Sequence, residues 1–409
     1  MILRDTLLSV LGDQVPPLGG NREIRREISA LIPEQSSQVI VLTGMRRTGK
    51  STLLGQLRDN APSGLYVNFE DTRLAGLEAT DLPRLLEASL QLAPGDAPFF
   101  FDEIQVLPGW EHFIRSLHDR GRRVIVTGSN ASLLSRELGT KLTGRHLSFE
   151  IFPFSYGEYL AYTGEKEHAE SLSSYLEIGG FPLMLRERSP QILRELLQDT
   201  ILRDVVSRHH LRETRHLMKL VLFLLANSGQ PFSFQSLTKN LAMPSVSGTA
   251  RLAEYLADAY LLLPVQKFSN SFKKRSISPT KFYPIDPGLR QANTPQSTPD
   301  IGRRLENAVY IELRRRRHPI WYASERDRWE CDFITDEHAI QVCLRLTPEN
   351  TLRELFGLRG ALTQAPDRRP IILTLDQEDV LDLDGVKVPV IPAWQWFMDR
   401  EALNKSALS

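Results

Sequence analysis

The segment GMRRTGKS at residues 44–51 has the residue types and spacing of a loop that holds the phosphates of a nucleotide. Its glycines allow backbone N–H groups to turn inward around phosphate oxygens, and a helix that starts there adds positive potential. Lys50 can reach the β- and γ-phosphates, and the hydroxyl of Ser51 can ligate Mg²⁺. The predicted binding residues are Gly44, Met45, Arg46, Arg47, Thr48, Gly49, Lys50, Ser51 and Thr52.

A pair of acids lies further along the chain, in FFFDEIQ at residues 99–105. The three phenylalanines indicate a buried strand whose end presents Asp102 and Glu103. Asp102 would hold the magnesium, directly or through water. Glu103 would polarise the attacking water as a general base. Without the glycine-rich loop, a capped strand end with two solvated acids would be the better interpretation, but the two motifs together predict hydrolysis of ATP.

Three further groups have a chemical and a structural interpretation. Ser129 and Asn130, at the end of another predicted strand, could touch the γ-phosphate or orient the water, or they could cap the helix that follows. Arg145 could reach a neighbouring subunit's γ-phosphate and stabilise transition-state charge, or it could be a surface arginine. Arg46 and Arg47 could contact phosphate, a partner subunit or solvent. NFED at 68–71 could aid the metal or simply cap a strand.

The elements that position these groups are short apolar runs separated by helical segments. Such runs indicate a parallel sheet that is buried on both faces, and we predict five strands. The first strand precedes the glycine-rich loop. A further strand lies between that loop and the acidic pair, and a glutamate follows the aspartate of the pair. Together these two features favour the ATPase branch of P-loop proteins. The predicted strands are 39–43, 65–69, 98–102, 123–127 and 147–151.

The remainder of the 409-residue chain is long enough for further domains. We predict an α/β ATPase core over 1–154 and a helical lid over 155–214. Residues 215–292 have the pattern of a winged helix, with a helix at 215–226, a second from Ser233 or Ser236, a third at 248–259 and a basic hairpin. A polar, proline-bearing linker precedes a mixed α/β unit over 301–409.

Many of these motifs resemble those of a large group of prokaryotic AAA-superfamily ATPases. The matching segments are TGMRRTGKST, NFED, FFDEIQ, TGSNASLLS, LTGR, FPFSYGEYL, GGFP, LRDVVSRHHL, KFYPIDPGL, RLENAVYIEL and ECDFITDEHAIQVC. The P-loop and the acidic pair are shared by many ATPases, whereas the later segments are specific to this group. The resemblance implies an AAA-type core, a winged helix, a C-terminal region of uncharacterised function, and a homo-oligomer such as a ring. The resemblance also favours the interpretation that Arg145 reaches the γ-phosphate of a neighbouring subunit.

A winged helix suggests contact with DNA. The third helix carries Arg251, but also Glu254 and Asp258, which phosphates would repel. The hairpin is more basic and could lie on a DNA backbone or in a minor groove. Its basic residues are Lys267, Lys273, Lys274, Arg275 and Lys281. The alternative is a winged helix that extends the lid or contacts a protein. The run 314–317, at a helix C-terminus, complements the helix dipole and needs no other function.

Residues 329–344, WECDFITDEHAIQVCL, predict an antiparallel strand pair. Matching apolar faces set Phe333 opposite Ile340, with Asp336-Glu337 as the turn, and put Asp332 opposite Gln341. With Glu306 on a preceding helix, this resembles the core of restriction-endonuclease-like folds. Those nucleases need an acid and a lysine where this chain has Gln341 and Cys343, so we expect a nuclease-like fold without cleavage activity. An unrelated α/β sheet is the alternative. In this register the two cysteines are not opposed, and no disulfide is expected.

Composition limits the remaining possibilities. Fifty basic and fifty acidic residues give a net charge of zero, so bulk charge argues neither for nor against nucleic acid. Two cysteines form no disulfide framework and no zinc-ligand set, which predicts a cytoplasmic protein. No signal peptide and no membrane span are expected.

Two functions follow as hypotheses. The first is an AAA-type ATPase that couples ATP hydrolysis to subunit movement on DNA. The second is a nucleotide-dependent switch that binds an unidentified protein partner, which the neutral charge and the acidic third helix favour. An ATP-driven nuclease is a weaker third interpretation.

Overall fold

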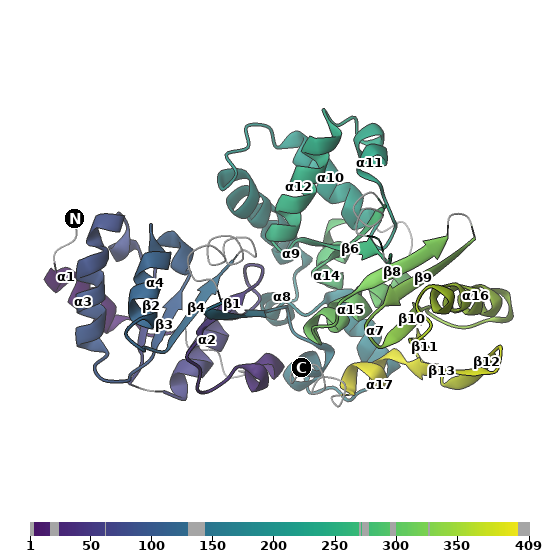
Figure 1. Ribbon diagram of the computed structural model, residues 1–409, viewed down its shortest axis with the longest axis horizontal. Helices are drawn as coiled ribbons and strands as arrows, with labels where there is room; N and C mark the ends of the chain where they lie inside the picture. Colours follow the sequence, from purple (N-terminus) through teal and green to yellow (C-terminus); the bar gives the residue numbers. More distant parts are fainter. Residues whose placement is uncertain are drawn as a thin grey trace. The chain divides into compact units, whose positions relative to one another are not determined.

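The computed structural model describes residues 4–16, 24–61, 63–129, 144–269, 271, 278–294, 300–325 and 328–399. The chain forms two compact units, Met1–Phe152 and Pro153–Ser409, and each has its own sheet (Figure 1). Four predicted site residues lie outside the described residues, namely Asn130, Lys273, Lys274 and Arg275.

The first unit is built on a five-stranded sheet in which every pairing is parallel, as predicted. Its order is β2-β3-β4-β1-β5, so β4 lies between the strand that enters the P-loop and the strand that ends at Asp102. The carboxyl ends of all five strands therefore meet at one edge. The strands are β1 (Val39–Thr43), β2 (Leu65–Asn68), β3 (Phe99–Asp102), β4 (Val124–Gly128) and β5 (His146–Glu150).

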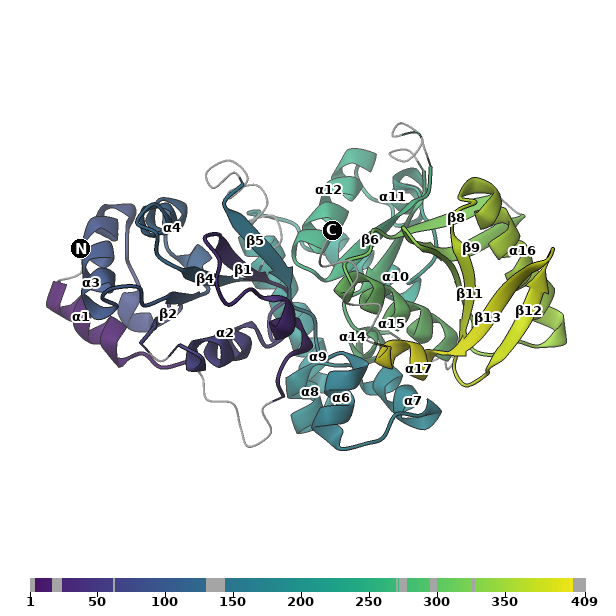
Figure 2. The same cartoon turned by 60° about the horizontal axis from the view of Figure 1, so that its bottom comes forward.

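Helices cover both faces of this sheet, which explains why the strands are apolar throughout. Helices α1 (Arg4–Asp13), α3 (Leu82–Leu92) and α4 (Trp110–His118) pack on one face, and α2 (Lys50–Asp59) packs on the other (Figures 1 and 2). Phe99 and Phe101 point to the first face and Phe100 to the second. Burying each ring contributes about 1.5–3 kcal/mol. Four 3₁₀ turns link these elements: η1 (Glu27–Leu31), η2 (Thr72–Leu74), η3 (Ala79–Asp81) and η4 (Ile104–Val106).

The second unit begins with helices whose ends are capped by specific side chains. The hydroxyl of Ser155 accepts the Glu158 N–H, and the Glu158 carboxylate accepts the Ser155 N–H, which starts the first helix. Helix α9 continues into a π-helical segment, η6. The bounds are α6 (Tyr156–Thr163), α7 (Ala169–Ile178), α8 (Pro182–Glu187), α9 (Pro190–Asp199) and η6 (Thr200–Ser207).

Two of the sequence segments specific to the resembled group meet in this unit. The Asp286 carboxylate accepts the N–H of Gly180 at 2.7 Å and that of Leu289 at 3.0 Å. A Cβ built at Gly179 would lie 2.0 Å from an Asp286 oxygen, so only glycine fits there. Burial raises the pKa of Asp286 to about 6, although the N–H groups of Gly180 and Leu289 oppose this rise.

Three helices and a strand pair occupy the range that predicted a winged helix. Ser233 caps the second helix and Ser245 the third. The elements are α10 (Arg215–Ala226), α11 (Phe234–Asn240), α12 (Val246–Asp258), β6 (Leu262–Lys267) and β7 (Thr280–Pro284), the last two antiparallel.

The strands β6 and β7 also belong to the sheet of the C-terminal region. That sheet has eight strands in the order β12-β13-β11-β10-β9-β8-β6-β7, and β6 pairs with β8 in parallel. Helix α16 packs on one face and α15 on the other. The strands are β8 (Trp321–Glu325), β9 (Trp329–Ile334), β10 (His338–Val342), β11 (Arg369–Thr374), β12 (Asp379–Leu383) and β13 (Val386–Pro392). The helices are α14 (Pro287–Asn293), α15 (Ile301–Arg315), α16 (Pro348–Gln364) and α17 (Ala393–Met398).

The strand pair β9–β10 confirms the predicted register, in which Phe333 lies opposite Ile340. Asp332 and Gln341 are adjacent, because the Gln341 side-chain oxygen accepts the Asp332 N–H at 2.8 Å. Their side chains nevertheless have different partners. The Gln341 amide donates to Glu354 of α16 at 2.7 Å, whereas the Asp332 carboxylate lies 3.7 Å from Lys281 of β7. Strand alternation alone did not predict either of these long-range partners.

The two cysteines, Cys331 and Cys343, are free and buried, in agreement with the expected absence of a disulfide between them. Among the described helices, none combines the length and apolarity that a bilayer crossing requires.

Candidate nucleotide-binding site

The loop between β1 and α2 has the geometry of a phosphate cradle. A Cβ built at Gly44 would lie 2.2 Å from the Ile151 carbonyl oxygen, so the loop can pass beside β5 only with glycine at this position. Gly49 has a φ of 94° and sits at the N-terminus of α2. That conformation favours glycine and lets the backbone turn into the helix. The N-terminus of α2, whose first-turn N–H groups have no acceptor within the helix, therefore lies beside the loop.

Lys50 is the first residue of α2, and it is almost fully buried. Its Nζ lies 3.0 Å from the carbonyl oxygens of Gly44 and Met45 and 3.9 Å from a carboxylate oxygen of Glu103. The P-loop lysine and the second predicted acid thus meet in one place. Ser51 and Thr52 occupy the same first turn of α2.

The Asp102 carboxylate is held by hydroxyl groups from both neighbouring strands. Thr127 of β4 donates its hydroxyl to one oxygen, and Tyr66 of β2 donates to the other at 3.1 Å. Burial and the negative charge of Asp102 raise the pKa of Tyr66, so its phenol stays protonated and remains a donor. These two bonds fix the carboxylate at the carboxyl edge of the sheet.

Glu103 adopts a left-handed backbone conformation with a φ of 50°, which turns the chain sharply at the end of β3. Its N–H donates to the Thr127 hydroxyl at 2.9 Å. Gln105 donates its amide to the Glu103 carboxylate and lies 3.5 Å from the Ser129 hydroxyl. Ser129 is therefore linked to the predicted base through a glutamine, and its predicted partner Asn130 lies outside the described residues.

Arg26 links the P-loop to the end of the first unit by hydrogen bonds. Its guanidinium donates to the Thr48 carbonyl at 2.8 Å and to the Phe152 carbonyl at 2.7 Å. The same group is 3.0 Å from the position of a Cβ at Gly49. Arg26 is buried, and it ties the residues before β1 to the P-loop and to the end of the unit.

Arg145 lies near the amino ends of the strands, whereas the P-loop lies at their carboxyl ends. Its carbonyl oxygen accepts the N–H of Val39, the first residue of β1, whereas the loop follows the last residue, Thr43. The length of β1 separates these ends by about 13 Å. The Arg145 guanidinium pairs with Asp119 at 2.9 Å. It is therefore not positioned to serve the P-loop of its own chain.

Arg46 and the segment NFED have partners within the first unit. Arg46 pairs with Glu70 at 3.5 Å, which links the loop to the segment NFED. The Asp71 side chain accepts the N–H of Arg73 and caps η2, and the Asn68 side chain accepts the N–H of Glu70. These bonds are those expected for the capping interpretation of NFED.

The residues of this edge fit a magnesium-bound triphosphate. Gly44 and Gly49 leave room that a Cβ would fill, and Ser51 and Asp102 supply a hydroxyl and a carboxylate, which are oxygen ligands that Mg²⁺ accepts. No group of three or more His, Cys, Asp or Glu side chains in the described chain could hold a metal alone. Mg²⁺ takes one or two protein carboxylates and completes its shell with phosphate and water.

In the second unit, Glu306 and Asp332, which the sequence pattern had placed together, surround Lys281 with Glu330, and neither Lys281 nor Glu330 was predicted there. The Nζ of Lys281 lies 2.7 Å from Glu330, 3.4 Å from Glu306 and 3.7 Å from Asp332. Burial alone would lower the pKa of Lys281, but the three carboxylates outweigh it and raise the pKa. Lys281 is fully buried, so the expectation that it belongs to a DNA-facing basic hairpin is wrong.

Two other basic features differ in their surroundings. Arg251 is exposed on α12, as a nucleic-acid contact requires, and Glu254 is exposed beside it. Arg316, in the run 314–317, bonds to Glu312 at 3.0 Å and stacks on Trp396 at 4.1 Å. Arg316 therefore stabilises the fold of this region.

Sequence reasoning missed Tyr66, Thr127, Gln105 and Arg26 at the nucleotide site. Tyr66 and Thr127 lie on predicted strands. The register pairs Phe101 with Val126, so Thr127 falls beside Asp102. Tyr66 pairs with Phe100 and reaches Asp102 with its long side chain. A signal was present for Thr127, since it is the polar residue that ends an apolar strand. Nothing in the local sequence around Arg26 indicates its contacts with residues 22 and 126 positions away.

Comparisons with known proteins agree with this geometry. A family model described as an AAA domain matches residues 36–160, and one described as a domain of unknown function matches residues 169–300. The uncharacterized protein MJ1544 of Methanocaldococcus jannaschii is 32% identical over 408 residues, which cover 91% of this chain and 90% of that protein. An uncharacterized protein of Haemophilus influenzae is 29% identical over 378 residues, which cover 87% and 93%.

Among solved structures, the Aeropyrum pernix ORC1 protein in complex with DNA aligns at 15% identity with a TM-score of 0.31. The alignment covers 71% of this chain and 95% of that one. This TM-score is too low for a conclusion about substrate or partner.

Proposed function

The chain belongs to the same protein family as MJ1544 of Methanocaldococcus jannaschii and contains an AAA domain, and from this premise we propose that it binds ATP with Mg²⁺ and hydrolyses it. The observation that carries the proposal is the 3.9 Å separation between Lys50 of the P-loop and Glu103 at the end of β3. A phosphate-binding lysine and a base for water are thereby held at one edge of the sheet.

Each residue has a defined part in the proposed reaction. The loop N–H groups and Lys50 hold the β- and γ-phosphates, while Ser51 and Asp102 hold the metal. The bound Mg²⁺ would neutralise charge on the phosphates. Glu103 accepts a proton from the attacking water, and Gln105 and Ser129 orient the Glu103 carboxylate. Tyr66 and Thr127 keep the Asp102 carboxylate in place.

We further propose that the chain works as a homo-oligomer in which Arg145 of one subunit serves the site of the next. The distance of Arg145 from its own P-loop supports this arrangement. An arginine placed against the γ-phosphate stabilises the charge that develops during transfer. The two free cysteines, Cys331 and Cys343, and the use of ATP support a cytoplasmic location in this proposal.

We propose that ATP hydrolysis drives movement of the subunits on DNA. Helix α12 presents the exposed Arg251, and the segment that joins β6 to β7 contains Lys273, Lys274 and Arg275. These residues lie in the range with three helices and a strand pair, the arrangement of a winged helix. Lysines and arginines on such a hairpin would contact phosphates without reading sequence.

The test is ATP turnover by the full chain with and without duplex and branched DNA, at low and moderate salt. We expect Mg²⁺-dependent turnover that DNA stimulates, and no turnover in the Lys50→Ala variant. A chain that takes up no labelled ATP would overturn the proposal. Turnover without any binding of DNA at low salt would remove its DNA part and leave the ATPase.

A nucleotide-dependent switch that binds a protein is the second candidate. The exposed Glu254 beside Arg251 favours it, because an acid there repels phosphate. Cleavage of DNA has less support. The carboxylates of Glu306, Glu330 and Asp332 surround the Lys281 ammonium, so a magnesium ion would have to displace a buried cation.

A further inference from the structure

The edge strand β12 of the eight-stranded sheet pairs with β13 and with no other strand in the described chain. A two-residue turn, Asp384-Gly385, joins these strands, and both of its residues have positive φ. Such a turn makes Leu383–Val386 a hydrogen-bonded pair, and the pairs alternate along the hairpin. The pair Val380–Pro389 is then not hydrogen-bonded, which suits a proline because it has no N–H.

It follows that Val380 and Asp382 turn their backbone N–H and C=O groups away from β13, toward the free edge. A second observation agrees, since the Val380 N–H bonds to the Asp379 carboxylate at 2.7 Å rather than to β13. The edge therefore offers the hydrogen-bonding groups to which a further strand could pair.

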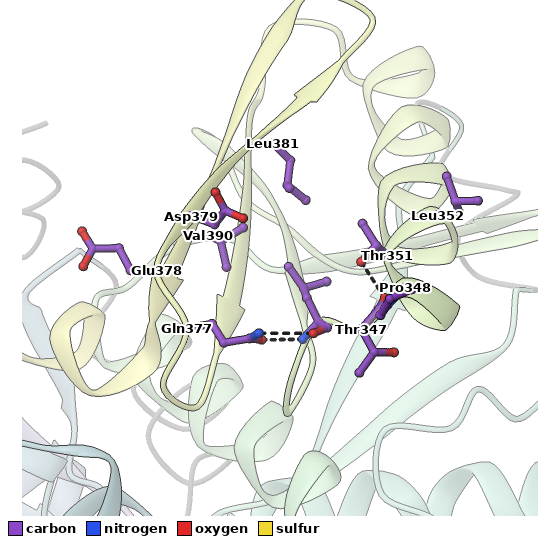
Figure 3. Close-up of a pocket in the computed structure, with 10 residues that line it drawn as sticks. Thr347, Pro348, Thr351, Leu352, Gln377, Glu378, Asp379, Leu381 and Val390 are labelled. Carbon is purple, nitrogen blue, oxygen red and sulfur yellow. Dashed lines mark hydrogen bonds between the residues drawn. The ribbon is translucent and has the colours of Figure 1, made fainter.

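A groove of about 600 Å³ runs beside this edge, between the start of α16 and β12 (Figure 3). Its apolar walls come from Leu352 of α16, Leu381 of β12 and Val390 of β13. The floor is fixed, because the Gln377 amide bonds to both the N–H and the C=O of Leu346, at 2.5 and 3.2 Å. Side chains of a strand added beside β12 would enter a preformed space.

Apolar surface is concentrated in this region. Eleven large apolar side chains are exposed in the described part of the chain, and five of them lie between residues 344 and 386. Leu352, on the groove, is 77% exposed, which is the highest value of the eleven. A large apolar side chain left exposed on a groove is a feature of interaction surfaces.

The charge of the groove is acidic. Glu378 and Asp379 line it, and no lysine or arginine does. Asp376, Glu378 and Asp379 make no ion pair with any described residue, whereas Asp382 pairs with Lys387 and Asp384 with Arg359. A basic occupant would meet uncompensated carboxylates.

We propose that β12 and this groove bind an extended segment of a partner protein in which apolar residues alternate with lysines or arginines. The segment would add to the sheet beside β12 and place its apolar side chains on the face of Leu381, toward Leu352. Its basic side chains would lie on the opposite face, on the side of Glu378 and Asp382. A second copy of this chain paired edge to edge would bring like charges together, and nucleic acid would be repelled by the same acids. The inference does not depend on ATP hydrolysis.

The test uses the full chain and a fluorescein-labelled peptide in which valine and leucine alternate with arginine and lysine, followed by fluorescence anisotropy. Two control peptides are matched to it. One has the same composition with the apolar residues contiguous, and the other carries N-methyl groups at alternate backbone nitrogens, which prevents strand pairing. We expect saturable binding of the alternating peptide and at least about tenfold weaker binding of both controls, because each removes one half of the recognition.

Variants locate the binding on the protein. Glu378→Lys with Asp379→Lys should weaken binding about tenfold by reversing the complementary charge, and Leu352→Ser should weaken it through lost apolar contact. The matched control is Glu167→Lys with Asp367→Lys, which changes exposed acids away from the groove and should leave binding unchanged.

Equal binding by the groove variant and the control variant would overturn the proposal, as would equal binding of the N-methylated peptide. Concentration-dependent dimerisation that the Glu378→Lys, Asp379→Lys variant abolishes, measured by sedimentation, would assign the edge to a second copy instead and would also overturn it.

Discussion

Asp102, the last residue of β3, accepts a hydrogen bond from the hydroxyl of Thr127, the next-to-last residue of the neighbouring strand β4. The same hydroxyl accepts the backbone N–H of Glu103 at 2.9 Å. One side chain of β4 therefore positions both members of the acidic pair, the proposed metal ligand Asp102 through its carboxylate and the proposed base Glu103 through its backbone. This relationship makes Thr127 a positioning residue for the proposed reaction.

Replacing Thr127 by valine keeps the shape of the side chain and removes both bonds. We expect a loss of about 1–3 kcal/mol in the free energy of unfolding, because a buried N–H and a carboxylate oxygen lose a partner. The Mg²⁺ concentration for half-maximal turnover should rise, while binding of ATP in the absence of metal should change little. Thr127→Ser is the control, and it should recover the metal dependence. Equal metal dependence of the valine and serine variants would contradict the assigned role.

Glu103→Gln tests the proposed base. Glutamine keeps the size of the side chain but cannot accept the proton of the attacking water, so turnover should fall about 10²–10⁴-fold. Binding of ATP, measured by equilibrium dialysis with labelled nucleotide, should be retained. Full turnover in this variant would refute the assignment of Glu103.

Arg145→Ala should leave ATP binding intact and lower turnover about 10³-fold or more if the arginine completes a neighbour's site. Mixing this variant with Lys50→Ala gives a sharper test. The Lys50→Ala subunits bind no nucleotide but still carry Arg145, so the mixture should regain turnover that neither variant has alone. No recovery in a mixture whose subunits are shown to associate would indicate that Arg145 only pairs with Asp119.

Arg26→Ala removes two hydrogen bonds from a charged donor to the carbonyls of Thr48 and Phe152. Each such bond contributes about 1.5–3 kcal/mol, so the loop should lose its fixed position and ATP affinity should fall. Arg26→Lys should recover part of the affinity, since a lysine can reach only one carbonyl well. Unchanged affinity for ATP in Arg26→Ala, with an unchanged melting temperature, would show that the loop keeps its conformation without the hydrogen bonds from Arg26.

The buried Asp286 predicts a pH dependence of stability. Its pKa in the folded chain is about 6, above the ordinary value of 3.8, because burial disfavours the charged carboxylate. The folded state then binds more protons than the unfolded state between about pH 4 and 6, so the stability contributed by this group is present below pH 4 and is lost as the pH rises through 6.

The loss amounts to about 3 kcal/mol, because a tenfold difference in proton affinity between the folded and unfolded states corresponds to about 1.36 kcal/mol. About 2 kcal/mol of this loss falls between pH 4.5 and pH 7. It is measured as the difference in urea unfolding free energy between the native chain and Asp286→Asn, which does not titrate, at these two pH values. A difference that stays constant across this range would contradict the raised pKa.

The nucleotide site was largely predictable from the sequence, because its parts are local. The glycines, Lys50 and Ser51 lie within eight residues, and Asp102 and Glu103 end one apolar strand. Since parallel strands present their carboxyl ends at a common edge, an alternation of apolar runs and helices already indicated that these groups would meet. The five-stranded parallel sheet confirmed that expectation.

The interactions that support the site could not be read in the same way. Tyr66 and Thr127 contact Asp102 only because the sheet order places β2 and β4 on either side of β3, and local patterns do not specify the order of strands. Arg26 makes its contacts across long stretches of chain, where sequence spacing carries no information about distance.

The C-terminal region shows the same division most clearly. The pairing of Phe333 with Ile340 followed from apolar alternation, which is a property of adjacent strands. The partner of the Asp332 carboxylate did not, because Lys281 arrives from a strand fifty-one positions earlier. Periodicity along one segment records which face is buried, whereas the identity of the buried partner depends on how distant segments meet, and only the tertiary structure decides that.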